Sequence, residues 1–184
     1  MRTRMRLLAV LALFLSAGLL SAADGSWRKK LDKQLPLLGH RNWIVVADSA
    51  YPWQTAPGID TVFTDEDQLD VLKGVLNALG KTKHVKPTVY IDAELSHVPE
   101  QDAKGISDYR DQLKKMLAGH EVQSLPHEQI ISKLDEAGKT FHVLLLKTKL
   151  TIPYTSVFLQ LDCGYWDASS EQKLREAIKK GARR

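Results

Sequence analysis

Six residues of this chain combine a chemically useful side chain with a position beside an apolar segment: His40, Asp48, His127, Tyr154, Thr155 and Ser156. Histidine titrates near neutrality, so it can give or take a proton at physiological pH. Ligands of open α/β sheets bind beyond the strand ends, which is where residues flanking apolar segments would lie. These residues therefore suit acid–base work on a bound ligand, although their spacing alone does not define a reaction.

Other common chemistries have no signature in the sequence. It contains no glycine-rich phosphate loop, no serine-hydrolase elbow and no paired cysteines or histidines at zinc spacing. The only cysteine, Cys163, lies in an apolar run, where we expect it to be buried, and it cannot form an internal disulfide. We therefore expect no metal site.

The segment from Leu35 to Trp53 contains the first pair of candidate residues. Within it, Trp43 to Ala47 is a continuous apolar run, typical of a strand covered on both faces. His40 precedes this run and Asp48 follows it. A strand rises ~3.3 Å per residue, so their Cα atoms would be up to about 26 Å apart. The two residues can share a site only if the segment bends or if neighbouring subunits contribute different ends.

Strands alternate with helices along the rest of the chain. Besides 43–47, the patterns predict strands at 60–64, 88–91, 121–125, 141–146 and 157–161. They predict helices from Ser26, from Thr64 or Asp65 to Gly80, at 101–117, after Pro126 and from Ser169. This order predicts an α/β fold, a three-layer sandwich with a mainly parallel central sheet.

The first 23 residues have the pattern of a secretory signal peptide. Basic residues open the segment, an apolar run extends from Leu7 to Leu20, and small residues follow up to Ala23. The apolar run is shorter than the ~20 residues of a spanning helix, which favours cleavage over a membrane anchor. We expect an exported protein, periplasmic or secreted and not membrane-bound after cleavage. Residues 24–184 would form a single domain with a C-terminal helical extension at about 168–181.

Charge and composition exclude some partners. The formal net charge is +4, but three of the arginines lie in the predicted signal peptide. Without them the net charge is about +1, which gives little electrostatic support to a nucleic-acid partner.

Three segments resemble the motifs of the D-ribose pyranase and L-fucose mutarotase family. In LGHRNWIVVADSAYP, a Leu-Gly-His turn leads into an apolar strand that ends in Asp, which places His40 and Asp48 on the motif. LPHEQI is similar to the second motif, in which a His-Glu pair opens a helix, and it contains His127. IPYTSVFLQLDCGYW resembles the third, in which Pro-Tyr and two small polar residues enter the last core strand. The three occur in the family order and span roughly residues 35–166.

The resemblance implies an isomerase that opens and recloses monosaccharide rings without a cofactor. Opening a hemiacetal needs a proton delivered to the ring oxygen while another leaves the anomeric hydroxyl, and histidine can do either. His40 would be the proton donor, while Asp48 and His127 would hold sugar hydroxyls. Tyr154, Thr155 and Ser156 would form the rest of the binding edge. The implied partners are a monosaccharide such as ribose or fucose, and further copies of the chain in a ring-shaped homo-oligomer with sites between subunits.

Four positions depart from the family pattern. Arg41 and Asn42 follow the motif histidine where the family usually has a small residue and Asp, so a carboxylate partner for His40 is missing. Leu150 stands in a usually acidic segment, and Ser156 stands where Asn is common. The departures favour a non-catalytic exported sugar-binding protein as one alternative. The added C-terminal helix favours another, an oligomeric interaction scaffold.

The candidate residues also have purely structural interpretations. His40 would then cap a turn, and Asp48 would accept hydrogen bonds from loop amides. His127 would be a first-turn helix residue, and Tyr154 a strand-edge aromatic. For Trp53, near the Asp48 loop, we expect a core position, with stacking on a sugar as the alternative.

Overall fold

The computed structural model describes residues 26–181, which contain a six-stranded sheet. The strands are β1 (Trp43–Ala47), β2 (Ile59–Phe63), β3 (Val85–Asp92), β4 (Glu121–Leu125), β5 (Val143–Lys147) and β6 (Val157–Cys163). Their order across the sheet is β2-β5-β1-β6-β3-β4. Only β6 runs antiparallel to its neighbours, β1 and β3. The predicted α/β fold with a mainly parallel sheet is confirmed.

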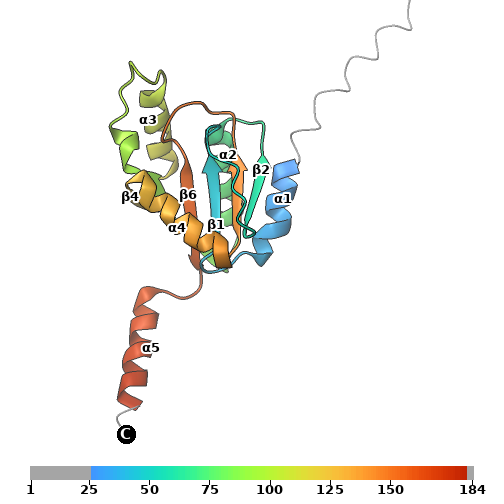
Figure 1. The fold of residues 1–184 in the computed structure, drawn as a ribbon. Helices are drawn as coiled ribbons and strands as arrows, with labels where there is room; N and C mark the ends of the chain where they lie inside the picture. Colours follow the sequence, from blue (N-terminus) through green and yellow to red (C-terminus); the bar gives the residue numbers. More distant parts are fainter. Residues whose placement is uncertain (1–25, 182–184) are drawn as a thin grey trace, which may run out of the picture.

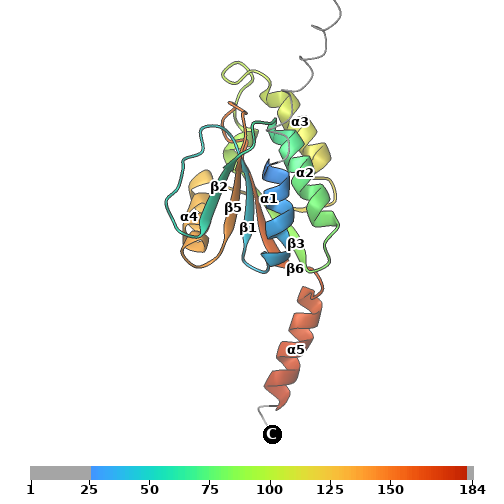
Figure 2. The same cartoon turned by 90° about the vertical axis from the view of Figure 1, so that its right-hand side faces the viewer.

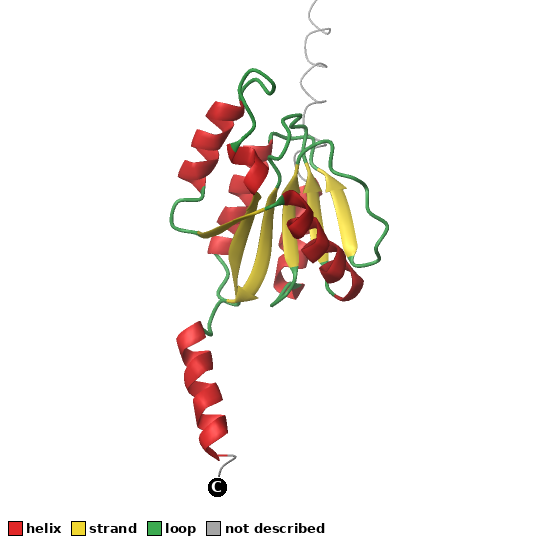
Figure 3. Ribbon diagram, turned by 60° about the vertical axis from the view of Figure 1, so that its left-hand side comes forward, coloured by secondary structure: helices red, strands yellow, loops and turns green. Residues whose placement is uncertain are grey.

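Helices cover both faces of this sheet (Figures 1 and 3). One face carries α1 (Ser26–Gln34), α2 (Gln68–Gly80) and α3 (Ile106–Met116), and the other carries α4 (His127–Thr140). Side chains of β1 alternate between the two layers: Ile44 and Val46 pack with α1 to α3, whereas Val45 packs with α4. This alternation follows from the two-residue period of a strand, and it explains the unbroken apolar run of β1.

The strand β1 is regular and fully buried along its length. Its register with β5 continues without a bulge from Trp43, opposite Val143, to Ala47, opposite Lys147. His40 and Asp48 therefore lie at opposite edges of the sheet. A bend in this segment therefore cannot bring His40 and Asp48 into one site, and they can share a site only if neighbouring subunits contribute one residue each.

Several element starts differ from the sequence prediction, and for three of them the reason is identifiable. The strand β3 begins at Val85 and includes Pro87, because β4 pairs with β3 only from Thr88 onward and needs no amide donor before it. The helix α2 is capped by Asp67, whose carboxylate accepts from the Leu69 amide.

The third difference concerns α3, which begins at Ile106 and not near residue 101. The carboxylate of Glu100 accepts hydrogen bonds from the amides of Gly105, at 2.6 Å, and Ser107, at 2.9 Å. These bonds hold the preceding residues in turns and satisfy the start of the helix.

The last helix, α5 (Ala168–Gly181), buries none of its residues and stands away from the sheet (Figures 1 and 2). Its apolar side chains Leu174 and Ile178 are both exposed. Among the helices of residues 26–181, none is long and apolar enough to cross a membrane. The predicted signal peptide, residues 1–23, lies outside the described residues and stays a prediction.

Candidate functional site

Most of the candidate residues gather at one edge of the sheet. The strands β1, β3 and β4 end at this edge, and β6, which runs the other way, begins there. The topology therefore brings Asp48, His127, Tyr154 and Ser156 together with Asp92, the last residue of β3. We call this group the C-terminal-edge cluster.

Asp48 and Ser156 form a direct pair within this cluster. The Ser156 hydroxyl donates to Oδ2 of Asp48 at 2.9 Å, and the Asp48 amide donates back to Ser156 Oγ at 3.2 Å. The other carboxylate oxygen of Asp48 accepts from the Ala50 amide at 2.9 Å. Asp48 thus stabilises its own loop and also orients the hydroxyl of the residue just before β6.

His127 begins α4 and is held by two acidic residues, one at the end of β3 and one in the turn that follows it. Its backbone amide donates to both carboxylate oxygens of Glu94, at 3.1 and 3.0 Å. This bond replaces the side-chain cap that Pro126, at the N-cap position, cannot supply. The imidazole Nδ1 lies 3.1 Å from Oδ1 of Asp92. Backbone and ring are therefore both fixed relative to β3.

Asp92 is a buried carboxyl, only 1% exposed. Burial raises the pKa of Asp92 to about 6, although the neighbouring His127 lowers it; Glu94 and Asp48 raise it further by charge repulsion. Its second oxygen, Oδ2, has no hydrogen-bond partner among the described residues. The cost of burying the Asp92 carboxyl is therefore offset mainly by its contact with His127.

Tyr154 and Thr155 have different surroundings although they are adjacent. Tyr154 has a positive φ of 57° and an exposed side chain, and its ring meets that of His127 edge-on with the centroids 5.7 Å apart. Thr155 is fully buried, and its hydroxyl donates to the Ile152 carbonyl at 2.7 Å. Tyr154 therefore faces the edge with His127, whereas the Thr155 side chain supports the loop from within.

A buried polar network lies under this loop. The Gln68 side-chain amide donates to the Thr155 carbonyl and, at 3.0 Å, to the Tyr109 hydroxyl, which itself donates to the same carbonyl. The Gln68 oxygen accepts from Thr148 at 3.0 Å. Burial raises the pKa of the Tyr109 hydroxyl, which therefore stays protonated. The network ties α2, α3 and β5 to the segment that presents Tyr154 and Ser156.

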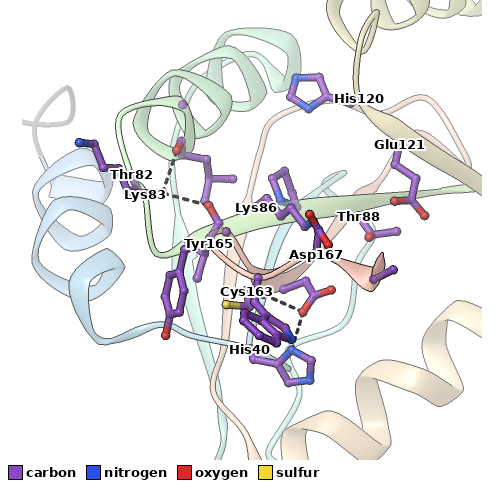
Figure 4. Close-up of a pocket in the computed structure, with 18 of the residues that line it drawn as sticks. His40, Thr82, Lys83, Lys86, Thr88, His120, Glu121, Cys163, Tyr165 and Asp167 are labelled. Atoms are coloured by element: carbon purple, nitrogen blue, oxygen red, sulfur yellow. Dashed lines mark hydrogen bonds and ion pairs between the residues drawn. The ribbon is translucent and has the colours of Figure 1, made fainter. Parts of the chain in front are cut away.

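His40 lies at the opposite edge, beside Asp162 near the end of β6. Its Nδ1 is 2.6 Å from the Asp162 carboxylate, and both side chains are about half exposed. Burial alone would raise the pKa of Asp162, but hydrogen bonds from the Cys163 amide and His40 lower it. The pair opens into a pocket of about 1200 Å³ whose lining includes Thr88, Glu121 and Trp166 (Figure 4).

Asn42, which replaces the family's Asp, closes the turn in front of β1. Its Oδ1 accepts from the Gly39 amide at 2.7 Å, and its side-chain amide donates to the His142 carbonyl at 3.1 Å. The carboxylate that the motif lacks at this position is supplied by Asp162, from β6.

Asp92, Glu94 and Asp162 are not among the site residues predicted from the sequence. Asp92 and Glu94 follow a predicted strand, as Asp48 does, but no motif includes them. Asp162 could not be identified in advance, because its position beside His40 depends on the antiparallel pairing of β1 with β6. The expectation that Trp53 lies in the core is wrong, since its side chain is 84% exposed. Cys163, also expected to be buried, is partly exposed.

Within residues 26–181 no group of histidine, cysteine or acidic side chains is arranged to hold a metal ion. The fold and the two edges together define an α/β protein with two histidine–carboxylate pairs, one at each end of a mainly parallel sheet.

The chain belongs to the RbsD / FucU transport protein family, whose model matches residues 24–163. Among solved structures, RbsD of Bacillus subtilis in complex with D-ribose aligns with a TM-score of 0.51 and 20% identity over 72% of this chain and 91% of its own. FucU of Bifidobacterium longum aligns with a TM-score of 0.49 and 18% identity, over 73% and 94% respectively. The fucose mutarotase of Streptococcus pneumoniae in complex with L-fucose gives 0.47 and 18%, over 72% and 91%. A search of the curated proteins gave no significant match.

Proposed function

We propose that this protein catalyses the interconversion of monosaccharide ring forms, as a pyranase or mutarotase that needs no cofactor. The observation that carries the proposal is the convergence of Asp48, His127, Tyr154 and Ser156, which are dispersed over 108 positions, at one edge of the sheet. Family membership supports the same activity, and the Bacillus subtilis relative was solved with D-ribose bound. D-ribose is therefore the first sugar to test.

The active site would form between two copies of the chain. Because β1 is straight, His40 cannot reach the C-terminal-edge cluster of its own subunit. In a ring-shaped homo-oligomer, the His40–Asp162 pair of one subunit would instead face the C-terminal-edge cluster of the next. The exposure of both edges is consistent with such a contact, as is the 84% exposed side chain of Trp53 in the loop after β1.

Ring opening requires two proton movements. His40, in its protonated form and paired with Asp162, would deliver a proton to the ring oxygen. A base at the other edge would remove the proton of the anomeric hydroxyl, whose O–H electrons form the carbonyl as the bond from C1 to the ring oxygen breaks. Reclosure by the same or another hydroxyl reverses both transfers and gives the other anomer or ring size.

Exchange NMR with D-ribose and L-fucose tests the activity on residues 24–184. We expect exchange between ring forms to exceed the spontaneous rate and to return to it in His40→Ala. The matched control is His120→Ala, which removes a second exposed imidazole from the pocket beside His40 without a contact to His40 itself (Figure 4). Saturation transfer to the sugar without faster exchange would instead indicate the non-catalytic binding protein, and no effect with either sugar would reject the proposal.

The shared site has its own test. His40→Ala and Asp48→Asn are each expected to be inactive, but random co-assembly would leave about a quarter of the sites with both intact halves. Co-expressed, co-purified variants should therefore regain about that fraction of the activity. No recovery in mixed oligomers would contradict a site built from two subunits.

We also propose that residues 1–23 direct export and are removed. The basic start, apolar run and small residues near Ala23 support this proposal. Mass spectrometry of the protein from its native host should find a mature N-terminus near residue 24, whereas an intact Met1 would contradict it.

A further inference from the structure

We propose that His127, held by Asp92, is the base that accepts the anomeric proton, and that Asp92 is the positioning residue behind it. This inference deepens the proposed function and rests on it. The family resemblance gave His127 only the role of holding a sugar hydroxyl, and no motif pointed to Asp92.

The geometry fixes one nitrogen of His127 and leaves the other available. Nδ1 is directed at Asp92, 3.1 Å away, while the backbone amide is held by Glu94 and the ring meets Tyr154 edge-on. Nε2 makes no hydrogen bond to any residue that the structure describes, and the side chain is 31% exposed. An imidazole whose Nδ1–H is donated to a carboxylate presents an unprotonated Nε2, which is the form that accepts a proton.

Asp92 suits this role better than that of a simple structural anchor. Its carboxyl is buried and has His127 as its hydrogen-bonding side chain within the described part of the chain. A buried carboxylate with an unpartnered oxygen is costly unless a positive charge forms beside it. Protonation of Nε2 during ring opening creates that charge. The Asp92–His127 pair is therefore most stable after His127 has accepted the anomeric proton.

The charged groups around Asp92 come from three elements. His127 faces it from α4, Glu94 from the turn after β3, and Asp48 from the end of β1. Two of these are carboxylates, which favour a proton on Asp92. Asp92 is therefore ionised, as the active form requires, only once the pH rises above about 6.

Every proton that moves during ring opening and reclosure has a donor and an acceptor. Nε2 takes the proton of the anomeric O–H, the electrons of that bond form the carbonyl at C1, and the bond from C1 to the ring oxygen breaks. The ring oxygen receives the proton from His40 of the facing subunit. Reclosure returns one proton to His40 and takes one from His127, so both residues end as they began and no further reactant is consumed.

The experiment compares wild type with Asp92→Asn and with His127→Gln, using exchange NMR over pH 5 to 8. The matched control for the carboxylate is Asp111→Asn, an exposed residue of α3. We expect Asp92→Asn to lower kcat roughly 10–100-fold while KM changes less than about threefold. The acid limb of its kcat/KM profile should move to lower pH, because the variant has no carboxyl with a pKa of about 6 that must first ionise.

A double variant separates action through His127 from a general structural effect. If Asp92 acts through the imidazole, adding Asp92→Asn to His127→Gln causes no further loss of kcat. Two independent losses, or an acid limb that does not move, would overturn the inference. A His127→Gln variant with wild-type kcat would also overturn the inference. This test remains valid even if Asp92→Asn does not fold. Wild-type protein without activity on any sugar would instead remove the proposed function, and this inference with it.

Discussion

His40 and Asp162 are 122 residues apart in the chain, yet the imidazole and the carboxylate lie 2.6 Å from each other. The antiparallel pairing of β6 with β1 brings them together, and the pair restores the carboxylate that Asn42 does not provide. A carboxylate beside an imidazole stabilises its protonated form, which is the form a proton donor needs. His40 therefore has a carboxylate neighbour on another strand, where the motif resemblance led us to expect none.

Replacing Asp162 tests the contribution of this pair. We expect Asp162→Asn to lower kcat/KM by up to about fivefold, a small effect because exposed ion pairs contribute only about 0.2–1 kcal/mol. Exchange NMR at one fixed pH measures the loss. Glu121→Gln removes a carboxylate that lines the same pocket without contacting His40, and it should leave kcat/KM unchanged. Equal losses in both variants would indicate a general charge effect.

The raised pKa of Asp92, about 6, predicts a pH-dependent stability. Between about pH 4 and 6 the folded protein keeps a proton on this carboxyl that the unfolded chain has lost. The contribution of Asp92 to stability is thus greatest below pH 4 and falls as the pH rises to 6. Asp92→Asn lacks this dependence, so its Tm minus that of wild type should increase by about 5 °C between pH 4 and 7. Thermal unfolding at both pH values measures it, and a constant difference would contradict the assignment.

The buried network around Gln68 predicts a different kind of loss. Gln68→Leu leaves the hydroxyl of Thr148 and the carbonyl of Thr155 with one partner fewer, at a cost of about 1–3 kcal/mol. The Tm should fall by roughly 3–10 °C. Because the loop that presents Tyr154 and Ser156 loses a support, KM should rise several-fold with a smaller change in kcat. Gln112→Leu, on the exposed face of α3, serves as control; an unchanged KM in Gln68→Leu would show that the loop is held without the network.

Hydrophobic patterning predicted most of the fold correctly. The strands 43–47 and 121–125 are predicted to the residue: the first has an apolar run that is buried on both faces, and the second lies between turn signals, and both are local properties of the sequence. The boundaries that failed depended on side-chain contacts at the ends of elements. Glu100 holds the turn before α3, and Asp67 caps α2, and neither is distinguishable from other acidic residues nearby.

The candidate site could be predicted only as far as the motifs extend. Asp48 and Ser156, 108 positions apart, were singled out separately, and the sheet order then brought them into contact. Asp162 and Asp92 could not be found in this way, because each acquires its histidine partner from strand pairing or from the docking of α4. Trp53 was misplaced because an aromatic residue next to a buried strand is usually internal, whereas here it lies exposed in the loop.

The helix α5 gives the last prediction. None of its residues is buried, and its contacts are local: Trp166 donates to Glu171 at 2.8 Å, and Arg175 pairs with Glu171 at 2.6 Å. Removal of residues 168–184 should therefore change the Tm by less than about 2 °C, whereas Ile106→Ala, a core change costing about 2–5 kcal/mol, should lower it clearly. Light scattering on the same samples would measure the assembly. If the truncated protein keeps its Tm and its ring-form exchange but loses its oligomer, then Leu174 and Ile178 contact another subunit, and α5 would be an assembly element that the active site does not need. A fall in Tm comparable with that of Ile106→Ala would contradict the unburied position of the helix.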